Sequence, residues 1–209
     1  MHSYFAALSL TAIIVMAPGP DFAVVLRNSL AGGRIAGVMT AVGIGLAAAV
    51  HVSYTIAGIG FLLTWSPNLY EVLKLIGAGY LAFLSIRMFQ SARADIPKSS
   101  FATGMPPLQA FKWGFFTNLT NPKVIIFILT VFLQIISPNM GLSEKLILGF
   151  IISSSFLIWF FVVSYLFTVP AILGFFIRIR PQMERVFGLL LILYAAGIAS
   201  TLNWPPHLV

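Results

Sequence analysis

Two apolar stretches of the chain are each interrupted by proline beside an ionisable residue. The first contains Pro18-Gly19-Pro20-Asp21, and the second contains Asn121-Pro122-Lys123. Proline lacks a backbone N–H and clashes with the carbonyl four residues earlier, so it breaks a helix. In hydrocarbon, irregular backbone is tolerated only against protein or a water-filled cavity. Two such breaks in corresponding positions of two halves are typical of a transporter's binding site.

The composition excludes a soluble domain. Of 209 residues, 59% are hydrophobic and 8% charged, whereas soluble domains carry roughly 25% charged residues. The net charge of +7 does not indicate nucleic-acid binding, because the basic residues lie scattered at the ends of apolar runs. The absence of cysteine excludes disulfides and thiolate metal sites. The three histidines lie too far apart in sequence to show a metal-ligand pattern, so no metal or cofactor is expected.

Six apolar runs approach or exceed the roughly twenty residues that cross a bilayer. The first is interpreted as a retained span, because residues 1–3 lack the basic residues of a signal peptide. Turn-forming residues such as Gly32-Gly33 and Arg180-Pro181 separate neighbouring runs. The runs are Tyr4–Leu26, Ile35–Leu63, Val72–Phe89, Phe111–Ile136, Leu146–Thr168 and Val186–Leu202.

The predicted fold is an all-α integral membrane protein with six transmembrane helices in two inverted three-helix repeats. The first repeat comprises residues 1–90, a cytoplasmic linker residues 91–107, and the second repeat residues 108–209. An odd number of spans in each half inserts the second half upside down, which pairs the broken first and fourth helices across a pseudo-dyad.

The distribution of Lys and Arg predicts the orientation in the membrane. Most of the 12 basic residues lie at one face, Lys74 and Lys145 lie at the other, and Lys123 lies inside a span. The positive-inside rule places the first face in the cytoplasm and both termini in the periplasm. The residues of the first face are Arg27, Arg34, Arg87, Arg93, Lys98, Lys112, Arg178, Arg180 and Arg185.

The second run contains a ridge of small residues suited to close helix packing. Packing within one subunit is the favoured interpretation, although such a ridge also permits a homodimer. Its members recur every four residues and are Gly37, Ala41, Gly45, Ala49, Ser53 and Ala57.

The second break has the sequence of a new helix start. Asn121 suits an N-cap and Pro122 the first helical position. Lys123 then falls in the first turn, where the helix dipole disfavours a cation. A lysine deep in a span also costs about 2.5–3.5 kcal/mol on insertion scales. A compensating anion is therefore expected, which could be Asp21, a substrate carboxylate or each in turn.

The candidate site has structural as well as functional interpretations. Asp21 suits the first turn of a helix that follows Pro20, and it could pair permanently with Lys123. Asn118 and Asn121 could bind substrate or only satisfy freed backbone groups. His51 is a candidate for proton coupling because its ordinary pKa is near neutral, or else an interior histidine that makes hydrogen bonds.

The chain resembles the LysE/RhtB-type amino-acid exporters over nearly its whole length. The resemblance implies a bacterial inner-membrane exporter of the threonine/homoserine type, driven by the proton-motive force. The matching residues are Pro18-Gly19-Pro20-Asp21-Phe22, the stretch from Arg27 to Gly33, Gly37, Gly43, His51, the stretch from Leu73 to Leu81, Phe111, Gly114, Phe115, Leu119 and Asn121-Pro122-Lys123.

The leading hypothesis is export of a small zwitterionic amino acid in exchange for protons across the lipid bilayer. Asp21 and His51 are the proton-coupling candidates. A membrane-embedded enzyme and a passive channel are the alternatives, although no Ser/His/Asp set or carboxylate pair indicates an enzyme. No Gly-x-x-x-x-Gly-Lys motif is present, so ATP is not the expected energy source. The predicted substrate-binding residues are Pro18, Gly19, Pro20, Asp21, Asn118, Asn121, Pro122 and Lys123.

Overall fold

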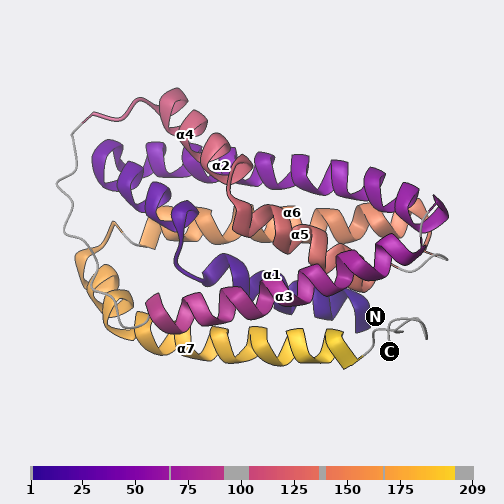
Figure 1. Ribbon diagram of the computed structural model, residues 1–209. Helices are drawn as coiled ribbons and strands as arrows, with labels where there is room; N and C mark the ends of the chain where they lie inside the picture. The colour runs from indigo at the N-terminus through magenta and orange to yellow at the C-terminus, as the bar shows by residue number, and fades with distance from the viewer. Residues whose placement is uncertain (1, 66, 92–103, 137–139, 167, 201–209) are drawn as a thin grey trace.

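The computed structural model describes residues 2–65, 67–91, 104–136, 140–166 and 168–200. The described residues form seven helices and no strand (Figure 1). The helices are α1 (His2–Met16), α2 (Pro20–Trp65), α3 (Pro67–Ser91), α4 (Pro107–Leu119), α5 (Pro122–Ile135), α6 (Leu142–Leu166) and α7 (Pro170–Ser200).

Both predicted helix breaks are confirmed. The first apolar run is divided between α1 and α2, and the chain is not helical at residues 17–19. The fourth run is divided between α4 and α5, whose axes differ by 57°. Each new helix begins with proline, which costs nothing at the first helical position because that N–H has no intrahelical partner.

The label α2 covers two helical segments that meet at Gly33. This glycine has φ 71° and ψ −173°, a backbone conformation in which a Cβ would be strained. The chain reverses direction there, and residues 34–65 run back along the bundle (Figure 1). The turn expected at Gly32-Gly33 is therefore present.

The predicted start of the last helix at Val186 is wrong. Helix α7 begins at Pro170 and continues through Pro181. The side chains of Arg180 and Glu184 form an ion pair of 3.0 Å across this proline. Such a pair supports a helix where proline removes a backbone hydrogen bond.

The helices form two groups with the shorter broken helices between them. Residues 34–65 of α2 pack against α4 and α6, whereas α3 packs mainly against α7. Helices α1 and α5 lie in the middle of the bundle (Figure 1). Helix α1 contacts α6, and α5 contacts α3 and α2. Both breaks adjoin these inner helices, and Ala17 and Asn121 are buried there, whereas Pro20, Thr120 and Pro122 are exposed.

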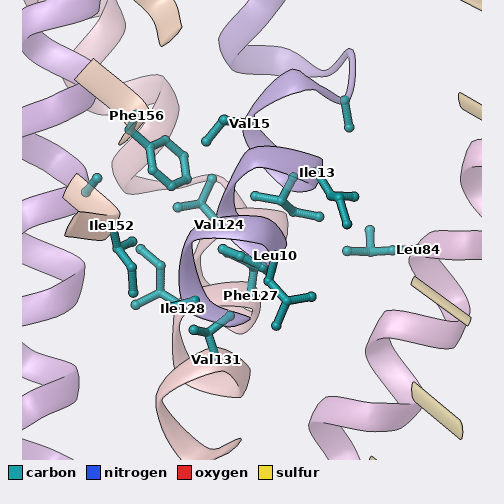
Figure 2. Packing of buried hydrophobic residues seen from close by; sticks show 14 of the residues in the cluster. Leu10, Ile13, Val15, Leu84, Val124, Phe127, Ile128, Val131, Ile152 and Phe156 are labelled. Carbon is teal, nitrogen blue, oxygen red and sulfur yellow. The ribbon is translucent and has the colours of Figure 1, made fainter. Parts of the chain in front are cut away.

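The core is built around α1 and α5. Figure 2 shows the side chains of these two helices interleaved and flanked by Ile152 and Phe156 of α6 and Leu84 of α3. Lipid is as apolar as these side chains, so their association depends on van der Waals packing rather than on exclusion of water. The labelled members from α1 and α5 are Leu10, Ile13, Val15, Val124, Phe127, Ile128 and Val131.

The small-residue ridge packs within the subunit at its first positions, as predicted. A Cβ on Gly37 would lie 2.8 Å from the Cβ of Ser164, and one on Gly45 would lie 2.9 Å from the Cβ of Leu157. Both neighbours belong to α6, so these positions allow α2 and α6 to approach closely. Ser53 and Ala57, farther along the ridge, are exposed.

The described helices include four that are long and apolar enough to cross a membrane, and α4 with α5 makes a fifth, broken span. Helix α1 contributes a shorter apolar segment, Tyr4–Met16. The start of α1 and the end of α7 lie at the same end of the bundle (Figure 1). The protein is thus an all-α membrane protein. The six-span inverted repeat and its domain boundaries stay predictions, and residues 92–103 of the linker lie outside the described residues.

Candidate functional site

The start of α5 has the predicted local structure. Asn121 is the N-cap, with φ −78° and ψ 106°, and Pro122 is the first helical residue. The side-chain Oδ1 of Asn121 accepts a hydrogen bond of 3.1 Å from the backbone N–H of Lys123. This bond satisfies one of the N–H groups that a helix start leaves without a partner.

Asp21 lies in the first turn of α2 and is 6% exposed. The positive end of the helix dipole favours a carboxylate at this position. Its Oδ2 accepts a hydrogen bond of 2.8 Å from Nδ2 of Asn118, at the end of α4. Its Oδ1 is also buried and has no hydrogen-bond partner in the described parts of the chain.

The side chain of Lys123 reaches the helix break between α1 and α2. Its Nζ donates a hydrogen bond of 3.2 Å to the carbonyl oxygen of Ala17, which follows the last residue of α1. Gly19 lies beside it, since a Cβ at Gly19 would be 3.5 Å from Nζ. Among the described residues, no direct ion pair joins Lys123 to Asp21. The permanent ion pair considered from the sequence is therefore absent from this conformation.

Asp21 and Lys123 instead line one small cavity. Asn121 is the other polar side chain in its wall. The cavity has room for about one water molecule. Figure 2 shows three of the apolar lining residues, Val15, Val124 and Phe156, around α1 and α5. The complete lining is Ile14, Val15, Ala17, Gly19, Asp21, Phe22, Asn121, Lys123, Val124, Phe156 and Phe160.

The structure brings together most of the residues predicted for the site. Gly19, Asp21, Asn121 and Lys123 line the cavity. Asn118 does not line it but contacts Asp21 directly. The prolines act through the backbone: Pro18 lies in the first break, and Pro20 and Pro122 begin the helices that carry the polar residues.

The apolar part of the wall was not identified from the sequence. Phe156 and Phe160 of α6 lie one helical turn apart and are 1% and 2% exposed. They stand in an unbroken apolar run, where neither charge nor proline distinguishes them from residues that face lipid. A four-residue spacing of phenylalanines was the available signal, and core packing produces the same spacing.

His51 lies next to the cavity residues rather than among them. It is 1% exposed. Its Nε2 is 3.2 Å from the carbonyl oxygen of Asn118, and its Nδ1 is 2.6 Å from the hydroxyl of Tyr54. Through Asn118, His51 is connected to Asp21.

The cavity combines one anionic and one cationic side chain at two helix starts. The dipole of a helix favours an anion at its N-terminus, although at the start of α5 the N–H groups of Lys123 and Val124 already donate to Asn121. The Lys123 ammonium has three donors and makes one described hydrogen bond, to Ala17. Asp21 retains an acceptor in Oδ1. The site therefore offers donors and an acceptor to a small molecule that carries both charges.

The chain is similar to known efflux proteins over nearly its whole length. The chain is 28% identical over 206 residues to the leucine efflux proteins of Salmonella typhimurium and Salmonella typhi, which covers 95% of this chain and of each relative. It is 27% identical over 205 residues to the uncharacterized membrane protein YahN of Escherichia coli, covering 93% of this chain and 88% of the relative. No solved structure matches the chain.

A protein-family model described as LysE type translocator matches residues 12–201. This match identifies a translocator rather than the membrane-embedded enzyme considered from the sequence. The chain belongs to the LysE type translocator family.

Proposed function

We propose that this protein exports neutral amino acids across the bacterial inner membrane, with the zwitterion bound between Asp21 and Lys123. The observation that carries the proposal is the shared cavity. It contains a buried carboxylate that has a free oxygen and a partly buried ammonium that does not contact this carboxylate. Isolated charges inside a membrane protein are costly and usually mark a substrate or ion path.

Each end of the substrate has a complementary partner. The substrate carboxylate binds Lys123 and the start of α5, because a helix N-terminus and an ammonium both attract an anion. The substrate ammonium binds Oδ1 of Asp21, which accepts no described hydrogen bond. Asn121 holds the start of α5 in place through its bond to the Lys123 backbone.

The side-chain preference follows from the rest of the wall. The resemblance to LysE/RhtB-type exporters implies a threonine- or homoserine-like substrate, whose hydroxyl needs a polar partner. Apart from Asp21, Asn121 and Lys123, the lining side chains are apolar. A buried hydroxyl without a partner is unfavourable. The apolar wall and the leucine efflux relatives therefore favour leucine over threonine and homoserine.

We further propose proton antiport in which Asp21 carries the proton. Protonation of this carboxyl removes the charge that attracts the substrate ammonium, so proton and substrate compete for one group. The exchange requires the carboxyl to lose its proton each time it binds substrate. Dissipating the proton gradient should then abolish net export, whereas a passive channel would continue to conduct.

The proposed orientation has cytoplasmic loops rich in Lys and Arg and periplasmic termini. The turn at Gly33, the end of α3, the start of α4 and the end of α6 lie together, opposite the ends of α1 and α7 that carry the termini (Figure 1). Arg34 and Lys112 follow the first and third of these points in sequence. This arrangement supports the charge-based orientation. Arg93 and Lys98 lie outside the described residues.

The deciding experiment measures efflux from cells loaded with dipeptides that release leucine, threonine or homoserine. Cells that contain the protein should lose leucine faster than control cells, and an uncoupler should remove the difference. Lys123→Ala should abolish this export while the protein still inserts, because the substrate carboxylate loses its cation. Unchanged efflux from Lys123→Ala would contradict the proposed site, and uncoupler-resistant efflux would favour a channel.

A further inference from the structure

The break before α5 leaves a backbone acceptor that His51 satisfies. In a continuous helix the N–H of residue 122 would donate to the carbonyl oxygen of Asn118, but Pro122 has no N–H. The carbonyl instead accepts from the backbone N–H of Asn121 at 3.0 Å and from Nε2 of His51 at 3.2 Å. The histidine thus supplies, from α2, a second donor to this carbonyl beside the Asn121 N–H.

This contact determines which ring nitrogen carries hydrogen. A carbonyl oxygen can only accept, so Nε2 of His51 must be the donor. The other nitrogen, Nδ1, then accepts from the Tyr54 hydroxyl in the neutral ring, at 2.6 Å. In a charged ring Nδ1 would donate to the same hydroxyl oxygen. The bond to Asn118 exists in both cases, so it does not require His51 to exchange a proton.

Asn118 links His51 to the residues of the cavity. Its backbone is held by His51, and its side-chain Nδ2 donates to Oδ2 of Asp21 at 2.8 Å. Asn118 is 0% and His51 1% exposed, so neither side chain has free space in which to reorient. With Oδ2 occupied by Asn118, Oδ1 is the oxygen that remains for a ligand.

We propose that His51 is a positioning residue for the Asp21 site. Its Nε2–H holds the end of α4 so that Asn118 fixes the Asp21 carboxylate, and this task requires a hydrogen-bond donor rather than a titrating group. The role in export rests on the proposed function, whereas the effect on the shape of the cavity does not. This distinguishes His51 from Asp21, to which proton exchange is assigned.

Three substitutions of His51 distinguish a role as a hydrogen-bond donor from a role as a proton carrier. His51→Gln places an amide donor near the position of Nε2 and does not titrate, His51→Asn carries a shorter amide, and His51→Leu has no donor. Uptake of labelled leucine into inverted vesicles should stay within about threefold of wild type for His51→Gln, with an unchanged pH profile. His51→Asn and His51→Leu should lower uptake at subsaturating leucine about tenfold or more.

Tyr54→Phe is the matched control, because it changes the contact of His51 Nδ1 and not that of Nε2. It removes the hydroxyl that contacts Nδ1 and leaves the bond from Nε2 to Asn118 in place. Positioning through Asn118 predicts near-normal uptake for this variant. The proposal is overturned if His51→Gln loses gradient-driven uptake but keeps leucine exchange at equilibrium, because that pattern identifies a proton carrier.

A second measurement does not depend on the substrate. The chain has no cysteine, so Gly19→Cys places a single thiol in the cavity wall, where a Cβ would make ordinary contacts with Lys123 Nζ and the Ala17 carbonyl oxygen. The rate of maleimide labelling at this thiol should change at least about threefold in His51→Leu and stay near the parent rate in His51→Gln. An unchanged rate in His51→Leu would refute positioning. If labelling follows this pattern but the protein does not transport leucine, the result would refute only the proposed substrate.

Discussion

Asp21 and Lys123 carry opposite charges in one cavity without pairing directly. Two buried charges that met in this conformation would satisfy each other and leave little affinity for a ligand. Asp21 is held instead by Asn118, and Lys123 by the Ala17 carbonyl. Neutral partners keep the two charges apart and available, which is consistent with the proposed binding and release of a zwitterion.

Replacing Asp21 by Asn should abolish export of leucine. The amide has nearly the same size but cannot attract the substrate ammonium or exchange a proton at physiological pH. Measured in cells loaded with a leucine dipeptide, the rate should fall about a hundredfold. Asn121→Ser is a useful comparison, because serine is also a good N-cap and should retain most of the activity. Robust uncoupler-sensitive export by Asp21→Asn would remove this carboxylate from both substrate binding and coupling.

A second buried charge cluster joins α3 to α7. Oε1 of Glu184 accepts from Nε of Arg180 at 3.0 Å and from Oγ of Ser91 at 2.9 Å. The Glu184 side chain is 2% and that of Arg180 13% exposed. Removing one member of a buried pair leaves the other charge poorly compensated.

Glu184→Ala should therefore destabilise the protein by about 3 kcal/mol or more. Unfolding in detergent, followed by circular dichroism, measures the loss. The control is Glu71→Ala, which removes a more exposed partner of Lys74, whose side chain is 19% exposed against 32% for Glu71. That change should cost no more than about 1 kcal/mol. Equal losses for the two variants would mean that burial of Glu184 is not the deciding factor.

At the scale of elements, the closest approach is between α2 and α4. A Cβ on Gly43 would overlap the carbonyl oxygen of Phe111, and one on Gly114 would overlap that of Thr40. Each helix thus presents a glycine to the backbone of the other. Such reciprocal small residues allow helices to pack without bulky side chains between them. The contact fixes α4, whose last turn carries Asn118.

Gly114→Ala should separate these helices and lower stability by about 1–3 kcal/mol, because backbone atoms cannot move aside as a flexible side chain can. The thermal midpoint in detergent measures the effect. Gly79→Ala is the control, since nothing lies within 4 Å of a Cβ there. In that exposed helical position alanine should be neutral or stabilise by up to about 1 kcal/mol. A Gly114→Ala protein as stable as Gly79→Ala would contradict the close packing.

The proline breaks and the N-cap at Asn121 could be predicted because they are local: proline chemistry and capping depend on adjacent residues. The partner of Asp21 could not be predicted in this way. The choice between Lys123 and Asn118 depends on how α4 and α5 are rotated, and an apolar run gives little information about rotation. For the same reason, the sequence did not show that Phe156 and Phe160 face the cavity. The start of α7 was missed because a proline that follows a charged residue resembles a turn, and the supporting Glu184 lies beyond it.

At the scale of the whole molecule, the site is formed by elements from both halves of the chain. Helix α1 and the start of α2 come from the first half, and α5 and α6 from the second. These parts enclose a cavity that fits about one water molecule. An amino acid is larger than this, so the elements must separate for substrate to enter. Under the proposed function the structure therefore corresponds to a closed conformation, and we expect access to alternate between the two faces during transport.

Alternating access predicts that labelling of a cavity thiol from the two faces is anticorrelated. Ala17 lines the cavity and is 3% exposed, and the chain offers no competing cysteine. Ala17→Cys is reacted with a membrane-impermeant maleimide in right-side-out and in inverted vesicles. A ligand can shift a conformational equilibrium only by binding one state better than the other. Any change of pH that raises labelling from one face should therefore lower it from the other. A channel has a pore open to both faces at once, so labelling that rises and falls together from the two sides would exclude alternating access.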